Sequence, residues 1–328
     1  MSIRSPFREP RPIGRDGASG NVAAAYDQSG ANYAAYADGD PMRLFAFCGL
    51  HAYADRRIWS LVEAKLTELR ATGAASVRIL DAGCGPGTWL RRIVARAHEL
   101  GFTTIDARGF DVARAQIQRA RLLARNLSGM SGVKLTFDVA DLIGELPEAD
   151  GSVDITLCLY SVLSHLPVAS LPKIAAEIAR VTSGCLITTV RSAGGAPTIL
   201  IDSIEKARRF QHDNIRDRIK IELCDGRRIE VAFHFFTASE LRSCFADHLD
   251  IEDLCGLDLF HHRFAPDPRW NPASLADDDQ FVDELERLEE AYATRSGFFD
   301  RAAHLLLVAR RRQPVVQTEP KPTIAARA

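Results

Sequence analysis

The sequence predicts an α/β fold in which helices cover a mostly parallel β-sheet. Short runs of β-branched and apolar residues alternate with segments of helical periodicity. Several of these runs end in an aspartate, and a glycine-rich loop follows the first of them. The 328 residues are 46% hydrophobic and 26% charged, which is ordinary globular composition and allows one large domain with additions.

The apolar runs give the expected strands in chain order. They comprise residues 77–80, 104–110, 133–137, 153–160, 185–190, 249–259 and 304–309. Helical patterns separate them, beginning with a segment whose apolar side chains recur near the 3.6-residue period and which Gly101 stops. Further helices are expected up to about Arg125, over 171–181 and over the charged stretch 279–293.

The region after the fifth strand departs from this alternation. Residues 219–224 and 229–236 flank Asp225-Gly226, which predicts a β-hairpin turn. Thr237 then caps a helix over 238–246, with Glu240 completing a capping box. We therefore expect a β-hairpin insertion at about 196–234.

Composition divides the chain into four parts. Residues 1–40 are expected to form a largely disordered or irregular arm, and 41–70 a helical lid. Residues 71–311 would form the main domain, and 312–328 a disordered tail.

Charge and cysteine content limit the classes of partner and location. Lys and Arg total 41 against 43 Asp and Glu, so no strongly basic field exists to hold a nucleic acid. The seven cysteines show no C-x-x-C pair, which fits a reducing compartment. The arginine-containing N-terminus lacks the apolar core of a secretion signal, and no apolar run is long enough to span a membrane. A cytoplasmic protein is expected, and the sequence carries no signal for an oligomeric state.

The most informative segment is the loop Asp81-Ala82-Gly83-Cys84-Gly85-Pro86-Gly87-Thr88, between a strand and a helix. Glycines let the backbone turn sharply and let a ligand approach, and the following helix N-terminus favours negative charge. The loop lacks the Gly-Lys-Ser/Thr of a phosphate loop, and Thr88 stands where a dinucleotide fingerprint has its third glycine.

At these residues the sequence resembles class I S-adenosylmethionine (SAM)-dependent methyltransferases, whose first motif has this acidic-x-Gly-x-Gly-x-Gly form. Gly109-Phe110-Asp111 resembles the second motif, in which a carboxylate accepts hydrogen bonds from both ribose hydroxyls. Residues 137–142 resemble the third, where a carboxylate meets the adenine amino group and the next amide a ring nitrogen. Residues 153–160, followed by Ser164-His165-Leu166, resemble the fourth strand and the segment lining the methyl donor.

The resemblance implies SAM as cofactor and a Rossmann-like three-layer sandwich. Its mostly parallel sheet would have seven strands, the last antiparallel, with the helical lid and the β-hairpin insertion added. The implied cofactor-binding residues are Asp81, Ala82, Gly83, Cys84, Gly85, Gly87, Thr88, Asp111, Val112, Asp138, Val139, Cys158 and Leu159.

Purely structural roles remain open for several of these residues. Asp81 could only cap its turn, and Asp111 could cap the next helix as well as bind ribose. Asp138 and Asp141 could be solvated loop carboxylates. His165 is expected to pack beside the site rather than act as a base.

Candidates for the acceptor side lie in the additions to the core. Tyr36 and Arg57 are candidate ligands of the cofactor carboxylate, the alternative being a surface lid packed on the sheet edge. His261 and His262 are the candidate catalytic bases, against a structural loop. No third residue with metal-ligand spacing accompanies them, so no metal site is predicted.

The predicted function is methyl transfer from SAM to an oxygen, nitrogen or carbon centre of a small-molecule acceptor. Three alternatives remain at this point. They are a non-catalytic SAM-binding or regulatory protein, a methyltransferase acting on RNA or protein, and a nicotinamide-dependent oxidoreductase.

Overall fold

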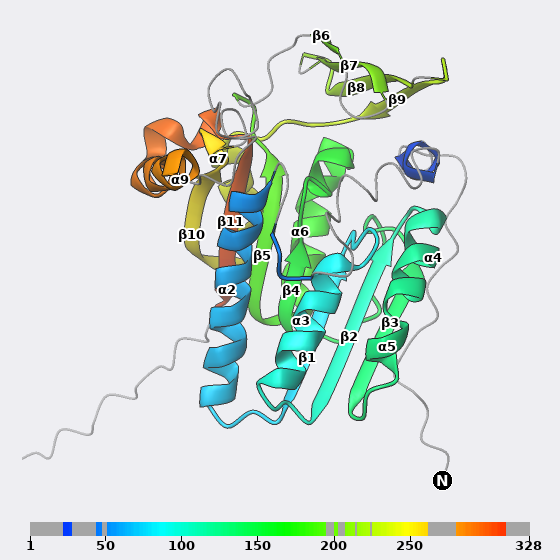
Figure 1. Cartoon of the computed structure of the whole chain (residues 1–328), viewed down its shortest axis with the longest axis vertical. Coiled ribbons are helices and arrows are strands. Elements are labelled where there is room, and N and C mark those ends of the chain that lie inside the picture. Colours follow the sequence, from blue (N-terminus) through cyan, green and yellow to red (C-terminus); the bar gives the residue numbers. More distant parts are fainter. Residues whose placement is uncertain are drawn as a thin grey trace, which may run out of the picture.

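The fold is built on one large mixed sheet, seen in the computed structural model (Figure 1). The structure describes residues 22–27, 44–47, 51–194, 200–202, 207–213, 215–223, 225–261 and 280–312. Its seven strands have the order β10-β11-β5-β4-β1-β2-β3. They are β1 (Ser76–Ala82), β2 (Thr104–Asp111), β3 (Val133–Val139), β4 (Val153–Cys158), β5 (Thr182–Arg191), β10 (Leu249–Leu257) and β11 (His304–Arg311).

The sheet has the strand directions expected of a Rossmann-like methyltransferase fold. β1 to β5 pair in parallel, whereas β11 is antiparallel to both of its neighbours, β5 and β10. Strand order reverses beside β1, so the loops after β1, β2 and β4 meet at one edge of the sheet. Ligands bind at such a switch point in open α/β sheets.

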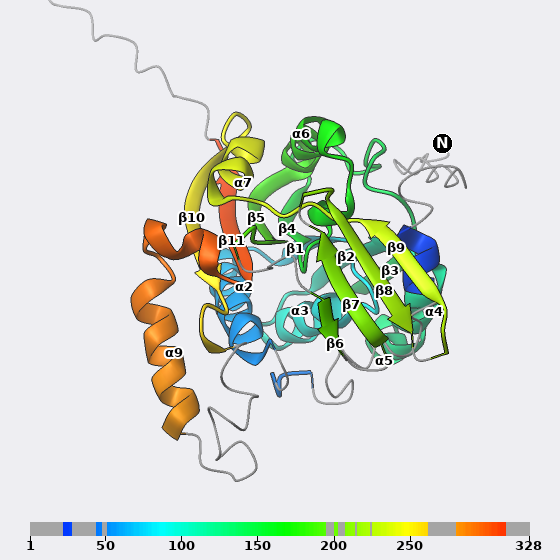
Figure 2. The same ribbon diagram turned by 90° about the horizontal axis from the view of Figure 1, so that it is seen from above.

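Helices cover both faces of this sheet and complete three layers. α2 (Ala52–Ala71), α3 (Thr88–Glu99), α4 (Arg114–Leu123) and α5 (Arg125–Ser128) lie on one face, and α6 (Leu171–Val181) and α7 (Ala238–Phe245) on the other (Figures 1 and 2). α9 (Gln280–Tyr292) lies beside the first turns of α2, to which the Arg56–Glu286 ion pair joins it. Short 3-10 turns occupy Leu163–His165, Val168–Ser170 and Ser296–Arg301. Two separate apolar clusters, one on each face, form the core.

The insertion after β5 is larger than the predicted hairpin. It forms a four-stranded antiparallel sheet of β6 (Leu200–Asp202), β7 (Ala207–Asp213), β8 (Arg218–Leu223) and β9 (Arg228–Ala232). The turn at Asp225-Gly226 does join β8 to β9, with Gly226 at a φ of 85°. This second sheet lies beyond the carboxyl ends of the parallel strands (Figure 1).

The N-terminal arm, expected to be irregular, contains a helix at 22–27. Val22 and Ala25 on this helix are buried against Ile219, Ile229 and Phe233 of the insertion. The helix is too short to be stable alone, so tertiary packing holds it.

α2, within the predicted 41–70 lid, packs on one face of the sheet as part of the helical layer. Ile58, Val62 and Leu66 are fully buried in the core beneath it. Only its first turn, preceded by His51, reaches the carboxyl edge of the sheet. Among the described residues, no helix is both long and apolar enough to cross a membrane.

Candidate functional site

The glycine loop after β1 is closed by backbone bonds to the end of β2. The amides of Gly83 and Cys84 both donate to the carbonyl of Phe110, at 2.8 and 2.9 Å. Gly83 has a φ of 77°, and a Cβ there would lie 2.3 Å from Cγ2 of Val162. The loop therefore requires glycine at this position, both for its backbone conformation and for its contact with the segment after β4.

Cys84 and Phe137 fill the space beneath the loop. A Cβ at Gly87 would meet the Phe137 ring at 2.7 Å, and one at Gly109 would meet Sγ of Cys84 at 2.9 Å. Burial raises the pKa of the Cys84 thiol well above its usual value. This cysteine is a packing residue, as its scattered position in the sequence suggests, and not a nucleophile.

Asp81 ends β1 with its carboxyl group buried in the sheet edge. Its residue is 2% exposed, between Gly109 of β2 and Leu157 of β4 in the strand register. Desolvation, with a smaller contribution from the charge of Asp111, raises the pKa of Asp81 to about 7. A cap that served only a solvent-exposed turn would not be desolvated in this way.

Asp111 connects the glycine loop to the start of α4. Its Oδ2 accepts from the Gly85 amide at 3.0 Å, and its Oδ1 accepts from the Ala113 amide at 2.8 Å. A carboxylate has about four acceptor positions, so these bonds leave capacity for hydroxyl donors. Burial raises the pKa of this carboxyl despite the two amides. Val112 packs against the insertion's apolar cluster.

Asp138 is engaged by an arginine. Arg108 donates from Nε to Asp138 Oδ2 at 2.9 Å and from NH1 to Glu148 Oε1 at 2.6 Å. Asp138 is therefore not simply a solvated carboxylate, because its Oδ2 is ion-paired with Arg108. The neighbouring Asp141 accepts the amide of Ile143 at 3.0 Å, as a loop-forming residue does.

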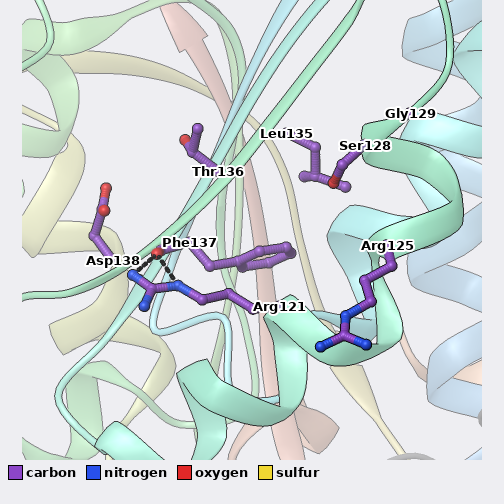
Figure 3. Close-up of a pocket in the computed structure, with 8 residues that line it drawn as sticks. All are labelled: Arg121, Arg125, Ser128, Gly129, Leu135, Thr136, Phe137 and Asp138. Atoms are coloured by element: carbon purple, nitrogen blue, oxygen red, sulfur yellow. Dashed lines mark hydrogen bonds between the residues drawn. The ribbon is translucent and has the colours of Figure 1, made fainter.

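A groove along β3 lies next to Asp138 (Figure 3). In this groove Arg121 donates to the carbonyl of Phe137, while Arg125 and Ser128 line the opposite side. Arg121 thus ties α4 to the end of β3, immediately before Asp138. This fixes the strand end where the third motif was predicted.

The segment after β4 turns abruptly. Cys158 is fully buried, burial raises its pKa to about 12, and its carbonyl accepts from Thr188 at 2.8 Å. Tyr160 and Ser161 follow with φ values of 52° and 70°. Strain at two successive residues is typical of a segment held in place for function. It orients the Tyr160 side chain across the carboxyl ends of β4 and β5.

The Tyr160 ring contacts a group that the sequence did not suggest. We call His51, Asp258 and His304 the histidine cluster. His51 Nδ1 lies 3.2 Å from Asp258 Oδ2, and His304 Nδ1 lies 4.0 Å from the same oxygen. The Tyr160 ring centre is 5.7 Å from that of each histidine. All are buried or nearly so, with the Asp258 side chain fully inaccessible.

The cluster's residues come from three distant elements. His51 precedes α2, Asp258 follows β10 at a φ of 59°, and His304 begins β11. His304 begins a predicted strand and Asp258 lies one residue before the end of another, whereas His51 lies inside the predicted 41–70 lid with no local pattern to mark it. Its assembly depends on tertiary structure, since His51 and Asp258 are 207 positions apart.

The structure does not place the remaining residues predicted from the sequence together at the glycine loop. Tyr36 and His262 lie outside the described residues. Arg57 pairs with Asp253 of β10 at 3.7 Å, four strand positions from β1 and hence roughly 19 Å away. The structure does not bring Arg57 to the glycine loop, and its cofactor role stays a prediction without support from this pairing.

His261 lies beside the histidine cluster in a fixed loop. Its ring centre is 6.0 Å from that of Tyr53, and burial lowers its pKa. Its amide donates to Glu289, which also accepts the amides of Leu259 and Phe260. A catalytic role for His261 stays a prediction.

The helix at 22–27 contacts the segments that follow β4 and β2. Tyr26 hydrogen-bonds Nε2 of His165 at 2.7 Å, and Asp27 accepts the amide of Ala115 at 2.8 Å. His165 follows β4 and Ala115 begins α4 after β2, so the helix bridges the two flanks of β1. Burial lowers the pKa of His165 to about 4, which fits the packing role expected for it and not that of a base at neutral pH.

Comparison with known proteins identifies a domain within the chain. Residues 79–184 match a family model described as a methyltransferase domain. No match was found among curated proteins. The structure is similar to that of the [4+2]-cyclase SpnF, with a TM-score of 0.52 and 18% identity, over 91% of this chain and 98% of that one.

Two further similar structures are methyltransferases by name. One is magnesium protoporphyrin IX methyltransferase from Synechocystis PCC 6803 with bound SAM, at a TM-score of 0.47 and 16% identity, covering 92% of this chain and 100% of that one. The other is a SAM-dependent methyltransferase from Clostridium acetobutylicum ATCC 824, at 0.49 and 11%, covering 78% and 92%.

The loop also fits the cofactor. A Cβ built on Gly85 would meet no atom within 4 Å, so the loop presents open space there, beside the Asp111 carboxylate that accepts its amide. A buried carboxyl at Asp81 suits a ligand that carries positive charge. The chain therefore contains a methyltransferase domain over residues 79–184, and its glycine loop fits the cofactor predicted from the sequence, SAM.

Proposed function

We propose that this methyltransferase acts on an oxygen, nitrogen or carbon centre of a small molecule. The supporting observation is that helix 22–27 and the insertion together cover part of the carboxyl edge of the sheet. Helix 22–27 bridges both flanks of β1, and the insertion packs above it. An edge covered in part by such additions suits a small acceptor better than a macromolecule, which needs an open groove.

Within this proposal, the cofactor-binding residues are those predicted from the motifs. Gly83, Gly85 and Gly87 would shape the loop around the cofactor, and Asp111 and Asp138 would orient its ribose and adenine. SAM supplies an activated methyl group. The protein then has to align the acceptor with that group and exclude water. The cover provided by helix 22–27 and the insertion favours both.

Two other functions are less well supported. Net charge is −2, with no excess of basic residues for an RNA substrate. The competing hypothesis is a non-catalytic SAM-binding or regulatory protein of the same fold.

The test is transfer of an isotope-labelled methyl group. The purified chain is incubated with methyl-labelled SAM and a metabolite extract, and labelled products are separated by mass. Label in a compound of low mass supports the proposal. Tight SAM binding without transfer would favour the non-catalytic alternative, and label in added RNA or protein would contradict the acceptor class. The Gly83→Ala variant controls for transfer by contaminants.

The affinity for SAM should rise with pH through neutrality. With a pKa of about 7, the Asp81 carboxyl is mostly neutral at pH 6 and mostly ionised at pH 8. The sulfonium and amino groups of SAM are cationic and favour the ionised form, so binding releases a proton on the acid side of this range. Calorimetry at pH 6, 7 and 8 measures this change, which Asp81→Asn should abolish.

The same shift has the opposite consequence for folding without cofactor. A carboxyl whose folded-state pKa is raised stabilises the fold when protonated, and this contribution is lost as pH rises from the usual carboxyl range through about 7. The wild-type chain should therefore lose stability relative to Asp81→Asn over that range.

For the binding prediction, the contradicting outcome is an equal pH dependence of SAM binding in the wild type and in Asp81→Asn.

A further inference from the structure

The histidine cluster contains a fully buried carboxylate, that of Asp258, with two imidazoles next to it. Oδ2 of Asp258 is 3.2 Å from His51 Nδ1 and 4.0 Å from His304 Nδ1, whereas Oδ1 has no hydrogen-bond partner in the described part of the chain. An unpaired buried carboxylate is costly, so this one must interact strongly with N–H groups or with a cation. Asp258 also has a φ of 59°, so the backbone is strained to present it.

The contacts of the two histidines indicate whether the Asp258 carboxylate interacts with N–H groups or with a cation. His304 Nε2 lies 3.5 Å from NH1 of Arg191, which only donates, so Nε2 accepts and Nδ1 carries the proton. An N–H on Nδ1 faces Asp258. The bond from His51 to Asp258 likewise requires the proton on Nδ1, since a carboxylate only accepts. This arrangement leaves the lone pair of His51 on Nε2.

A metal ion would need the opposite arrangement. The three candidate ligand atoms do lie within 4.8 Å of one another. However, coordination through Nδ1 of His304 would place an N–H on Nε2, against the N–H of Arg191. The positive charge of Arg191 beside His304 also repels a cation, so the arrangement favours an acid–base site. The hydroxyl of Tyr160 donates to Asp55, which is paired with Arg92.

The site lies at the carboxyl edge of the sheet, the edge where an acceptor is expected to bind. Tyr160 follows directly after the Cys158-Leu159 segment and contacts both histidines. Arg191 ends β5 opposite His304 in the strand register. The cluster therefore stands at the carboxyl edge of the sheet over β5, β11 and β10, and Tyr160 links it to the end of β4, the neighbour of β1.

We propose that His51 is the general base of methyl transfer and that Asp258 is its positioning residue. This rests on the proposed function and narrows it, because the acceptor must carry an ionisable proton on oxygen or nitrogen. As the acceptor's O or N forms a bond to the methyl carbon, its proton passes to Nε2 of His51. The carbon–sulfur bond breaks with its electron pair left on sulfur, which becomes a neutral thioether. The proton leaves to solvent from His51 after release.

The first experiment requires no acceptor. Long-range proton–nitrogen NMR of the ¹⁵N-labelled chain with S-adenosylhomocysteine reports the imidazole tautomer, and His51→Gln assigns the His51 signals. We expect the Nδ1–H tautomer in the wild type and a shift towards Nε2–H in Asp258→Asn, whose amide can donate to Nδ1. The exposed His98, changed to Gln, is the matched control and should leave these signals unchanged. An Nε2–H tautomer in the wild type would overturn the proposal.

The second experiment measures transfer to the acceptor found with labelled SAM. His51→Gln and Asp258→Asn should lower kcat by about 10²-fold or more, the usual range for loss of a general base, with SAM affinity nearly unchanged. His98→Gln should retain wild-type kcat. Undiminished transfer by His51→Gln, or loss confined to His261→Gln, would refute the assignment of the base.

Calorimetry with Zn²⁺ or Mn²⁺ alone completes the test. We expect no stoichiometric binding to the wild type. Binding that His51→Gln abolishes would overturn the proposal and make the cluster a metal site. If no acceptor is labelled at all, the proposed function fails, whereas the tautomer and metal measurements still decide the state of the cluster.

Discussion

Replacing Gly83 by alanine should abolish most SAM binding. The residue has a φ of 77°, and a Cβ there would lie 2.3 Å from a methyl group of Val162. The left-handed backbone alone costs about 1–2 kcal/mol for a residue with a side chain. The clash must also displace either the glycine loop or the segment after β4, and both border the cofactor. Because about 1.4 kcal/mol corresponds to tenfold in affinity, we expect at least a tenfold loss.

Gly85→Ala is the matched control for this effect. Its φ is 51°, but a Cβ there would meet no protein atom within 4 Å. Backbone strain is thus nearly the same in the two variants, and only Gly83→Ala adds the clash. Calorimetry with SAM and thermal unfolding of both variants separate the two contributions. If Gly85→Ala weakens SAM binding as much as Gly83→Ala does, although it lacks the clash, its new methyl group meets the cofactor. Equal affinities in all three proteins would contradict the predicted loop contact.

The second large effect is expected from Glu289→Ala. The carboxylate of Glu289 is fully buried and accepts three successive amides, those of Leu259, Phe260 and His261, at 2.9, 2.6 and 2.8 Å. Removing it leaves three buried donors without this acceptor, each worth about 1–3 kcal/mol if unsatisfied. We expect a loss of roughly 3 kcal/mol or more in the free energy of unfolding.

Denaturant unfolding of the two neighbouring variants Glu289→Ala and Glu290→Ala measures this effect. Glu290 is exposed on the same helix, so its change should alter stability by less than about 0.5 kcal/mol. Similar losses in both variants would show that helix propensity or net charge, and not the three amides, is responsible. Limited proteolysis near residue 261 should also increase in Glu289→Ala alone.

Local sequence patterns were sufficient for the main sheet and the glycine loop. Each predicted strand of that sheet corresponds to an observed one, the helix over 171–181 has the predicted bounds, and Thr237 forms the expected capping box with Glu240. These elements depend on periodicity and capping, which residues close in sequence determine. The predicted helix ending near Arg125 is interrupted at Ala124, where two shorter helices meet.

Features that depend on distant contacts could not be predicted in the same way. Helix 22–27 is only about two turns long and is stabilised by the insertion's apolar side chains. The second sheet has four strands because β6 and β7 add to the predicted hairpin. Likewise, His51 shows no special local pattern, and its partner Asp258 is brought to it by the fold. The adjacent histidines at 261 and 262 were the more visible signal in the sequence.

The bridge made by helix 22–27 has a consequence for the rate of turnover. Its bonds to His165 and to the Ala115 amide join the segments after β4 and β2, on either side of the loop predicted to bind SAM. We expect the spent cofactor to leave between these segments. Each catalytic cycle would then include opening and redocking of this helix, a step that often limits enzymes with closing segments. Under such a limit, a pre-steady-state burst of methylated product should precede the slower steady rate. Weakening the bridge with Tyr26→Phe should accelerate the steady phase while leaving the burst unchanged.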